Sequence, residues 1–144
     1  MPGLAPAPTP RIVIFDDSSD AIERYGRVFA EVGCDYLTSR QPAINDDFRA
    51  ALLAFRPDLV IVDLVMGEGR RDGYRLIAEI RDVAFLDGVP PIIVGSKLIT
   101  HSPMGAAEKA AAESEPGVVA AFGKFPELPT AAQFLAHARQ PPTK

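Results

Sequence analysis

Five polar residues stand at the ends of apolar segments of this chain, where side chains from separate segments can meet. They are Asp16, Asp17, Asp63, Ser96 and Lys124. Three carboxylates that lie together repel one another, and burying them without a cation costs free energy. Mg²⁺ relieves such repulsion, because it prefers oxygen ligands and binds through one or two carboxylates together with phosphate oxygens. Three acids, a hydroxyl and an ammonium group therefore indicate phosphate chemistry.

Phosphoryl transfer gives each of these residues a role. The reaction needs a nucleophile in line with the phosphorus atom and cations that neutralise the remaining phosphoryl oxygens. Asp63 follows the central apolar segment and is the predicted nucleophile, and Asp16 and Asp17 are predicted to hold the metal. Ser96 can donate a hydrogen bond to the transferred group, and Lys124 can pair with it as a compact charge.

The segments that must position these side chains are short and have the length of strands. They are Arg11–Phe15, Asp35–Thr38, Asp58–Val62, Pro91–Val94 and Val118–Phe122. Segments that are apolar throughout are typical of strands buried on both faces of a parallel sheet. Because parallel strands end at one edge of a sheet, we expect all five polar side chains to converge there.

Helical patterns alternate with the five strands. Apolar residues recur at helical spacing in three places, an alanine-rich stretch follows, and a capping pair begins the last helix: Ile22–Val32, Phe48–Phe55, Tyr74–Ile80, Met104–Glu113 and Thr130 with Gln133. Asp20 and Glu23 resemble a capping box at the start of the first helix, and Gly33 is the predicted end. The pattern predicts an α/β, flavodoxin-like (βα)5 fold, a doubly wound parallel five-stranded sheet with strand order 2-1-3-4-5. Ligands of such sheets bind beyond the carboxyl ends of the strands.

Length and composition favour one globular domain. The chain has 144 residues, 47% of them hydrophobic and 24% charged. We expect an extended Pro-rich leader over residues 1–10, which does not resemble a signal peptide, the domain over 11–139, and a tail over 140–144. A net charge of −4 argues against direct, nonspecific binding of nucleic acid. No apolar run approaches the roughly 20 residues that span a bilayer, and the single cysteine, Cys34, indicates a reducing, cytoplasmic compartment.

Each site residue also has a structural explanation that needs no chemistry. Asp16, Asp17 and Asp63 are acids after strands, and such acids often cap helices or stabilise turns. Ser96 can bond its own loop, and an isolated Lys124 is most simply a solvated surface charge. These explanations would have to hold independently at four strand ends, which favours the functional interpretation.

Several stretches resemble the receiver domains of two-component response regulators. They are Ile12–Asp17, Pro57–Met66, Asp72–Arg81, Pro90–Ser96 and Lys124 within FGKFP. The resemblance implies that Asp63 is the phosphoacceptor and that Asp17, Asp63 and the backbone carbonyl of Val65 ligate Mg²⁺, with Asp16 acting largely through water. It further implies a phosphohistidine donor on a sensor histidine kinase or a histidine phosphotransfer protein, and an output protein that the sequence does not identify. Such a protein catalyses its own phosphorylation and dephosphorylation rather than acting as a conventional enzyme.

The sequence departs from the receiver pattern around the acceptor. Gly67 follows Met66 where a proline is usual, and the loop of residues 67–73 is long. Lys97 stands where a small residue is favoured, and it either pairs with the phosphoryl group or points to solvent. Apolar Val65 and Leu98 are predicted to flank the phosphoryl group and orient attacking water poorly, which would make the aspartyl phosphate long-lived.

The pattern also changes near the end of the domain. Phe125 separates Lys124 from Pro126, and Ala121 occupies the usual aromatic switch position, with Phe122 one place later. The segment between Ser96 and Lys124 is longer than typical, so the output face is expected to differ as well.

Two other functions compete with the phosphoacceptor hypothesis. One is a pseudo-receiver that binds a protein partner without phosphorylation, and Lys97 and Ala121 keep it open. The other is an aspartate-nucleophile phosphatase of the haloacid-dehalogenase kind, with Asp16 as nucleophile. That family needs a second acid two residues further on, and this chain has Ser18 there.

Overall fold

Five parallel strands form one sheet in the order β2-β1-β3-β4-β5, as the sequence predicts. The computed structural model describes residues 9–66, 70–125 and 127–138, and for residues 70 and 71 only the backbone. The strands are β1 Arg11–Phe15, β2 Asp35–Ser39, β3 Leu59–Asp63, β4 Ile92–Ser96 and β5 Val118–Gly123. Most of the proposed leader, residues 1–8, and the tail 140–144 lie outside the described residues.

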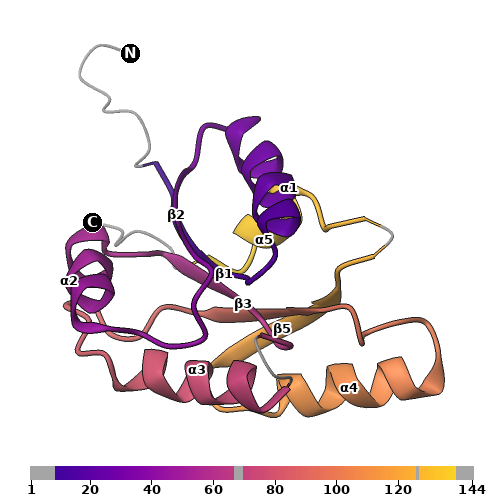
Figure 1. Ribbon diagram of the computed structural model, residues 1–144. Coiled ribbons are helices and arrows are strands. Elements are labelled where there is room, and N and C mark those ends of the chain that lie inside the picture. Colours follow the sequence, from indigo (N-terminus) through magenta and orange to yellow (C-terminus); the bar gives the residue numbers. More distant parts are fainter. Residues whose placement is uncertain (1–8, 67–69, 126, 139–144) are drawn as a thin grey trace.

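Five helices cover the two faces of the sheet (Figure 1). They are α1 Ser19–Ala30, α2 Asp46–Phe55, α3 Arg70–Asp82, α4 Pro103–Glu113 and α5 Ala131–Leu135. α1 and α5 pack on one face, and α2, α3 and α4 pack on the other. Among the described residues, no helix is long and apolar enough to cross a bilayer.

Burial on both faces explains why the central strands are apolar throughout. Every residue of β3 and β4 is buried, as is every residue of β1 after Arg11. β2 and β5 are the edge strands, and they are only partly buried. Burial on both faces therefore holds for the three central strands, whose segments are apolar, and not for the two strands at the edges of the sheet.

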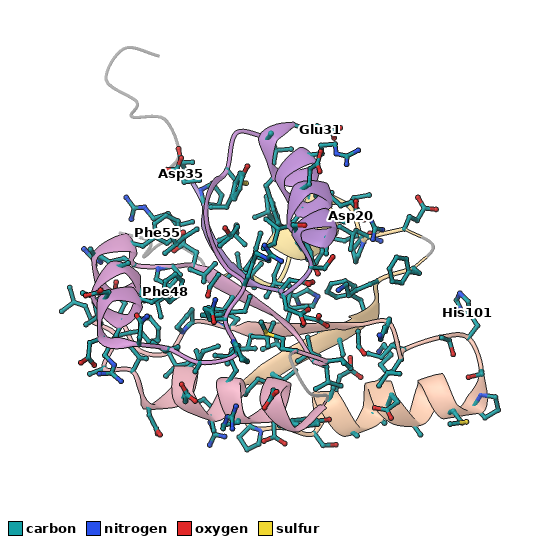
Figure 2. All side chains as sticks on the ribbon, in the orientation of Figure 1. Asp20, Glu31, Asp35, Phe48, Phe55 and His101 are labelled. Carbon is teal, nitrogen blue, oxygen red and sulfur yellow. The ribbon has the colours of Figure 1, made fainter. Side chains whose placement is uncertain are left out.

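Two hydrophobic cores fill the space between the sheet and the helices, one on each face. Alternate residues of each strand enter opposite cores, so Val13 packs toward α2 and α3 while Ile14 packs toward α1 and α5. In Figure 2, Phe48 and Phe55 lie on α2, and Phe48 meets Phe15 of β1 edge-on at 5.5 Å between ring centroids. These cores hold the carboxyl ends of the strands in fixed positions.

The helix ends bear out one of the local sequence signals and correct two others. Thr130 and Gln133 form the predicted capping box at the start of α5. The predicted box of Asp20 and Glu23 was wrong, because the N-cap of α1 lies two residues earlier, at Ser18, whose side chain accepts from the N–H of Ala21 at 3.2 Å. α1 also ends at Ala30, before Gly33. The early start places the loop of Asp16 and Asp17 directly against the first turn of α1.

Candidate phosphoacceptor site

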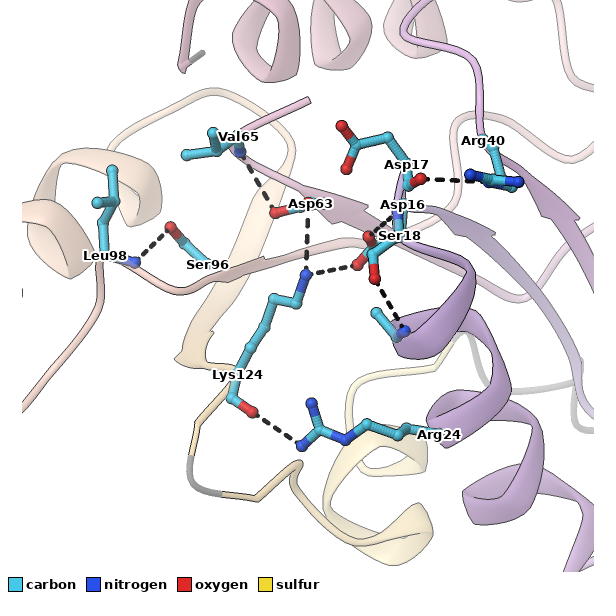
Figure 3. Close-up of polar contacts among 11 residues, drawn as sticks. Asp16, Asp17, Ser18, Arg24, Arg40, Asp63, Val65, Ser96, Leu98 and Lys124 are labelled. Carbon is cyan, nitrogen blue, oxygen red and sulfur yellow. Dashed lines mark hydrogen bonds and ion pairs between the residues drawn. The ribbon is translucent and has the colours of Figure 1, made fainter. Parts of the chain in front are cut away.

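The structure brings the predicted site residues to the carboxyl edge of the sheet, as Figure 3 shows. Asp63 is the last residue of β3 and pairs in register with Gly95 of β4. Asp16 directly follows β1, and Lys124 directly follows β5. The convergence follows from the topology, because β1 and β3 are neighbours at the centre of a parallel sheet.

Three carboxylates gather at this edge. Asp16, Asp17 and Asp63 each offer an oxygen within 4.8 Å of the others. Asp16 is fully buried and Asp63 is 4% exposed, whereas Asp17 is partly open to solvent. Carboxylates this close and this dry repel one another strongly, so the cluster calls for positive charge.

Lys124, at the carboxyl end of the edge strand β5, supplies positive charge to the cluster. Its Nζ donates to Asp16 Oδ2 at 2.7 Å and lies 3.4 Å from Asp63 Oδ2. The lysine is itself 5% exposed, so it is no solvated surface charge. The second oxygen of Asp16 accepts from the backbone N–H of Ser18 at 3.0 Å. Lys124 thus lies closer to Asp16 than to Asp63, the predicted nucleophile.

The environment of Asp63 favours its protonated form. Burial, and then the negative charge of Asp16, raise the pKa of Asp63 to about 7, although Lys124 and the N–H of Val65 oppose the shift. The Val65 N–H donates to Asp63 Oδ1 at 3.3 Å. Lys124 alone therefore does not hold Asp63 fully ionised at neutral pH. A further cation would do so.

A pocket of about 290 Å³ opens over the acids. Charged side chains make up most of its wall, and its lining residues are Asp17, Ser18, Asp20, Ala21, Arg24, Asp63, Val65, Lys97, Lys124 and Phe125. Lys97 is exposed and lines this pocket, so it is placed at the rim of the site rather than away from it. The pocket is open to solvent and accessible to an anionic group.

Two expected neighbours of the phosphoryl group do not line this pocket among the described residues. Ser96 is fully buried, and its Oγ accepts from the N–H of Leu98 at 3.0 Å. Leu98 is half-buried beside it. Val65 and Leu98 were both predicted to flank the phosphoryl group, but of the two only Val65 is among the lining residues of the pocket.

The aromatic residue of β5 packs on the face opposite to the predicted switch position. Ala121 is buried in the core under α4, whereas Phe122 packs against Phe134 of α5 at 5.2 Å between ring centroids. Phe122 also fills space beside Gly95, where an added Cβ would lie 2.5 Å from its Cζ. The displacement by one residue therefore changes which helices the ring packs against.

Sequence reasoning missed Arg24, which reaches the site from α1. Its guanidinium donates to the backbone carbonyl of Lys124 at 3.1 Å and lies 5.1 Å from the ring centroid of Phe125. The two partners are about a hundred positions along the chain from Arg24, so no local spacing signals the contact. Only the parallel arrangement of β1 and β5 around the same edge brings them together.

Comparison with known proteins identifies the class of this fold. No protein-family model matches the chain, and no curated protein sequence matches it. Among solved structures, a CheY-like response regulator receiver domain from Methylobacillus flagellatus is similar, with a TM-score of 0.64 and 13% identity over 90% of this chain and 98% of that one. A response regulator receiver protein from Burkholderia phymatum has a TM-score of 0.58 and 25% identity, over 81% and 84% of the two chains.

A third similar structure is the BeF3-activated N-terminal receiver domain of Klebsiella pneumoniae RstA, with a TM-score of 0.62 and 20% identity over 90% of this chain and 99% of that one. The chain therefore has the fold of the CheY-like response regulator receiver domains. The strand order 2-1-3-4-5 and the five covering helices agree with that fold.

Proposed function

We propose that this chain is a phosphorelay receiver that accepts a phosphoryl group on Asp63 in a Mg²⁺-dependent reaction. The observation that carries the proposal is the gathering of three carboxylates within 4.8 Å of one another beside a buried lysine, under an open pocket. A structural role alone gives no reason to concentrate such repulsive charge at the edge where parallel α/β sheets bind ligands.

The donor set fits a hard divalent ion. The cluster offers carboxylate oxygens only, and the raised pKa of Asp63 marks an acid that lacks sufficient positive charge nearby. Asp16, Asp17 and Asp63 would hold the ion together with the backbone carbonyl of Val65, Asp16 acting largely through water. When bound, Mg²⁺ would neutralise phosphoryl oxygens and favour the ionised form of Asp63.

The chain's own residues account for the transfer. An oxygen of ionised Asp63 attacks phosphorus, the bond from phosphorus to the donor's histidine nitrogen breaks, and its electron pair stays on that nitrogen. Lys124 lies between Asp16 and Asp63, so its ammonium can turn toward the oxygens of the new phosphoryl group. Ser96 is buried one strand away, and its hydroxyl can donate a hydrogen bond to the transferred phosphoryl group if its loop shifts.

The proposed donor and output come from the likeness to response regulator receiver domains. A phosphohistidine on a sensor histidine kinase or on a histidine phosphotransfer protein is the proposed phosphoryl source. Phosphorylation would replace a carboxylate by a dianionic group and so change the demands on Lys124 and Ser96. We propose that this change switches a surface that binds an output protein.

A titration with Mg²⁺ and beryllofluoride tests this function against that of a pseudo-receiver. Beryllofluoride imitates a phosphoryl group on a carboxylate, and the RstA receiver domain was solved in a BeF3-activated form. We expect amide NMR signals around residues 16, 63 and 124 to shift on addition of Mg²⁺, and to shift again with beryllofluoride only when Mg²⁺ is present.

The competing function has one observation in its favour, since the Lys124–Asp16 ion pair already neutralises part of the cluster. A pseudo-receiver predicts no beryllofluoride binding at any Mg²⁺ concentration, and that result would reject our proposal. Asp63→Asn should also fail to bind beryllofluoride. Asp47→Asn, an exposed acid in the first turn of α2, is the matched control and should bind it as the wild type does.

A further inference from the structure

Arg24 connects α1 to the residue that carries the site's buried cation. Its Nη2 donates to the carbonyl oxygen of Lys124 at 3.1 Å, as Figure 3 shows. The same guanidinium stacks over the ring of Phe125 at 5.1 Å from the centroid. Phe125 is 60% exposed, so the stacking covers part of an aromatic ring that is otherwise in water.

These contacts complete the anchoring of Lys124. Its backbone N–H donates to the carbonyl of Ser96 at 3.2 Å, and its own carbonyl accepts from Arg24. β4 and α1 therefore hold the two sides of this residue. A lysine side chain is flexible and ends in a compact charge. Fixing its backbone narrows the range of positions that Nζ can reach, and in this structure Nζ lies between Asp16 and Asp63.

We propose that Arg24 is a positioning residue for phosphoryl transfer, acting through Lys124. The inference rests on the proposed function of Asp63. Arg24 holds the Lys124–Phe125 segment by one charged hydrogen bond and one cation–π contact, and thereby keeps the ammonium near both Asp16 and the acceptor, Asp63. The insertion of Phe125 after Lys124 gives the guanidinium its second surface. Arginine suits this place because its planar group can donate and stack at once.

Replacing Arg24 should slow transfer without weakening the metal site. We expect Arg24→Ala to reduce the maximal rate of labelling by a saturating acyl phosphate roughly tenfold, the size of effect that one charged hydrogen bond supports. The Mg²⁺ affinity should be equal or higher, because a nearby positive charge has been removed. Arg27→Ala removes the same charge from the same helix, where Arg27 pairs with exposed Glu23 at 3.8 Å, and should label at the wild-type rate.

Arg24→Lys separates positioning from simple attraction of an anionic donor. Lysine keeps the charge but cannot both donate to the carbonyl and lie flat on Phe125. We therefore expect the donor concentration at half-saturation to stay at the wild-type value while the maximal rate remains reduced at least threefold. A wild-type maximal rate for Arg24→Lys or Arg24→Ala would overturn the proposal.

Hydrogen exchange at the Lys124 amide gives a readout that does not depend on phosphorylation. This amide bonds to Ser96, and we expect it to exchange about tenfold faster in Arg24→Ala and unchanged in Arg27→Ala. Unchanged exchange in Arg24→Ala would refute the anchoring role directly. A wild-type chain that fails to label overturns the function of Asp63 and this inference with it, whereas normal labelling of both wild type and Arg24→Ala overturns the inference alone.

Discussion

Without divalent ions at pH 8, the Asp63→Asn variant should be more stable than the wild type by about 2–4 kcal/mol. The wild type must keep a buried carboxylate ionised beside Asp16, which is why the pKa of Asp63 rises to about 7. A carboxyl group whose pKa is raised by folding stabilises the fold at low pH, where it is protonated. That advantage is lost as the pH rises from its ordinary pKa toward 7, and asparagine never incurs the loss.

Urea denaturation at pH 5 and pH 8 measures this effect. The stability difference between variant and wild type should grow between the two pH values, because both proteins share all other titrating groups. Asp47→Asn, on the surface of α2, should shift stability by no more than about 0.5 kcal/mol and with no such pH dependence. Equal stability of Asp63→Asn and the wild type at pH 8 would show that the carboxylates of Asp16 and Asp63 do not repel as the geometry requires.

Removing the ammonium of Lys124 should have the opposite and larger effect. Lys124→Met leaves the buried carboxylates of Asp16 and Asp63 without their cation, and breaking a buried pair in this way costs about 3–5 kcal/mol. We expect this loss in the free energy of unfolding at pH 8 in the presence of a chelator. Mg²⁺ should restore part of it, since the ion supplies positive charge to the same oxygens.

Lys109→Met is the matched control for that experiment. Lys109 pairs with Glu113 at 2.9 Å on the surface of α4, and such exposed pairs contribute about 0–1 kcal/mol. If the two lysine variants lose equal stability, or if Mg²⁺ fails to improve Lys124→Met, then Lys124 is not the cation on which the acid cluster depends.

The fold could be predicted from the sequence because its strongest signals are physical requirements of the fold. β3 and β4 are buried on both faces, so nearly every residue in them must be apolar, and the pattern is unmistakable. The pattern of β2 is weaker because this edge strand has no buried residue and so tolerates polar side chains. The start of α1 was misplaced because Ser18, Asp20 and Glu23 all carry capping side chains, and only the chain's path after β1 selects Ser18.

The site was predictable in its composition and less so in its contacts. Chain order and parallel strands suffice to bring Asp16, Asp63 and Lys124 to one edge. The preference of Lys124 for Asp16 over Asp63 depends on tenths of an ångström, which no spacing encodes. Arg24 was missed because its partners are remote in sequence.

The aromatic residue of β5 illustrates how a shift of one position changes the packing of a side chain. Side chains alternate between the faces of a strand, so moving the ring from position 121 to position 122 takes it from the core under α4 to the core under α1 and α5. Phe122 there lies against Gly95 of β4 and packs on Phe134 of α5.

The most direct test of the account is to map the phosphorylated residue. The chain is incubated with an acyl phosphate, with Mg²⁺ or with a chelator, and the labelled peptide is identified by mass spectrometry for the wild type, Asp63→Asn and Asp47→Asn. We predict one phosphoryl group on Asp63, formed only with Mg²⁺, absent from Asp63→Asn and unchanged in Asp47→Asn. Label on Asp16, or equal labelling of Asp63→Asn and the wild type, would contradict the assignment.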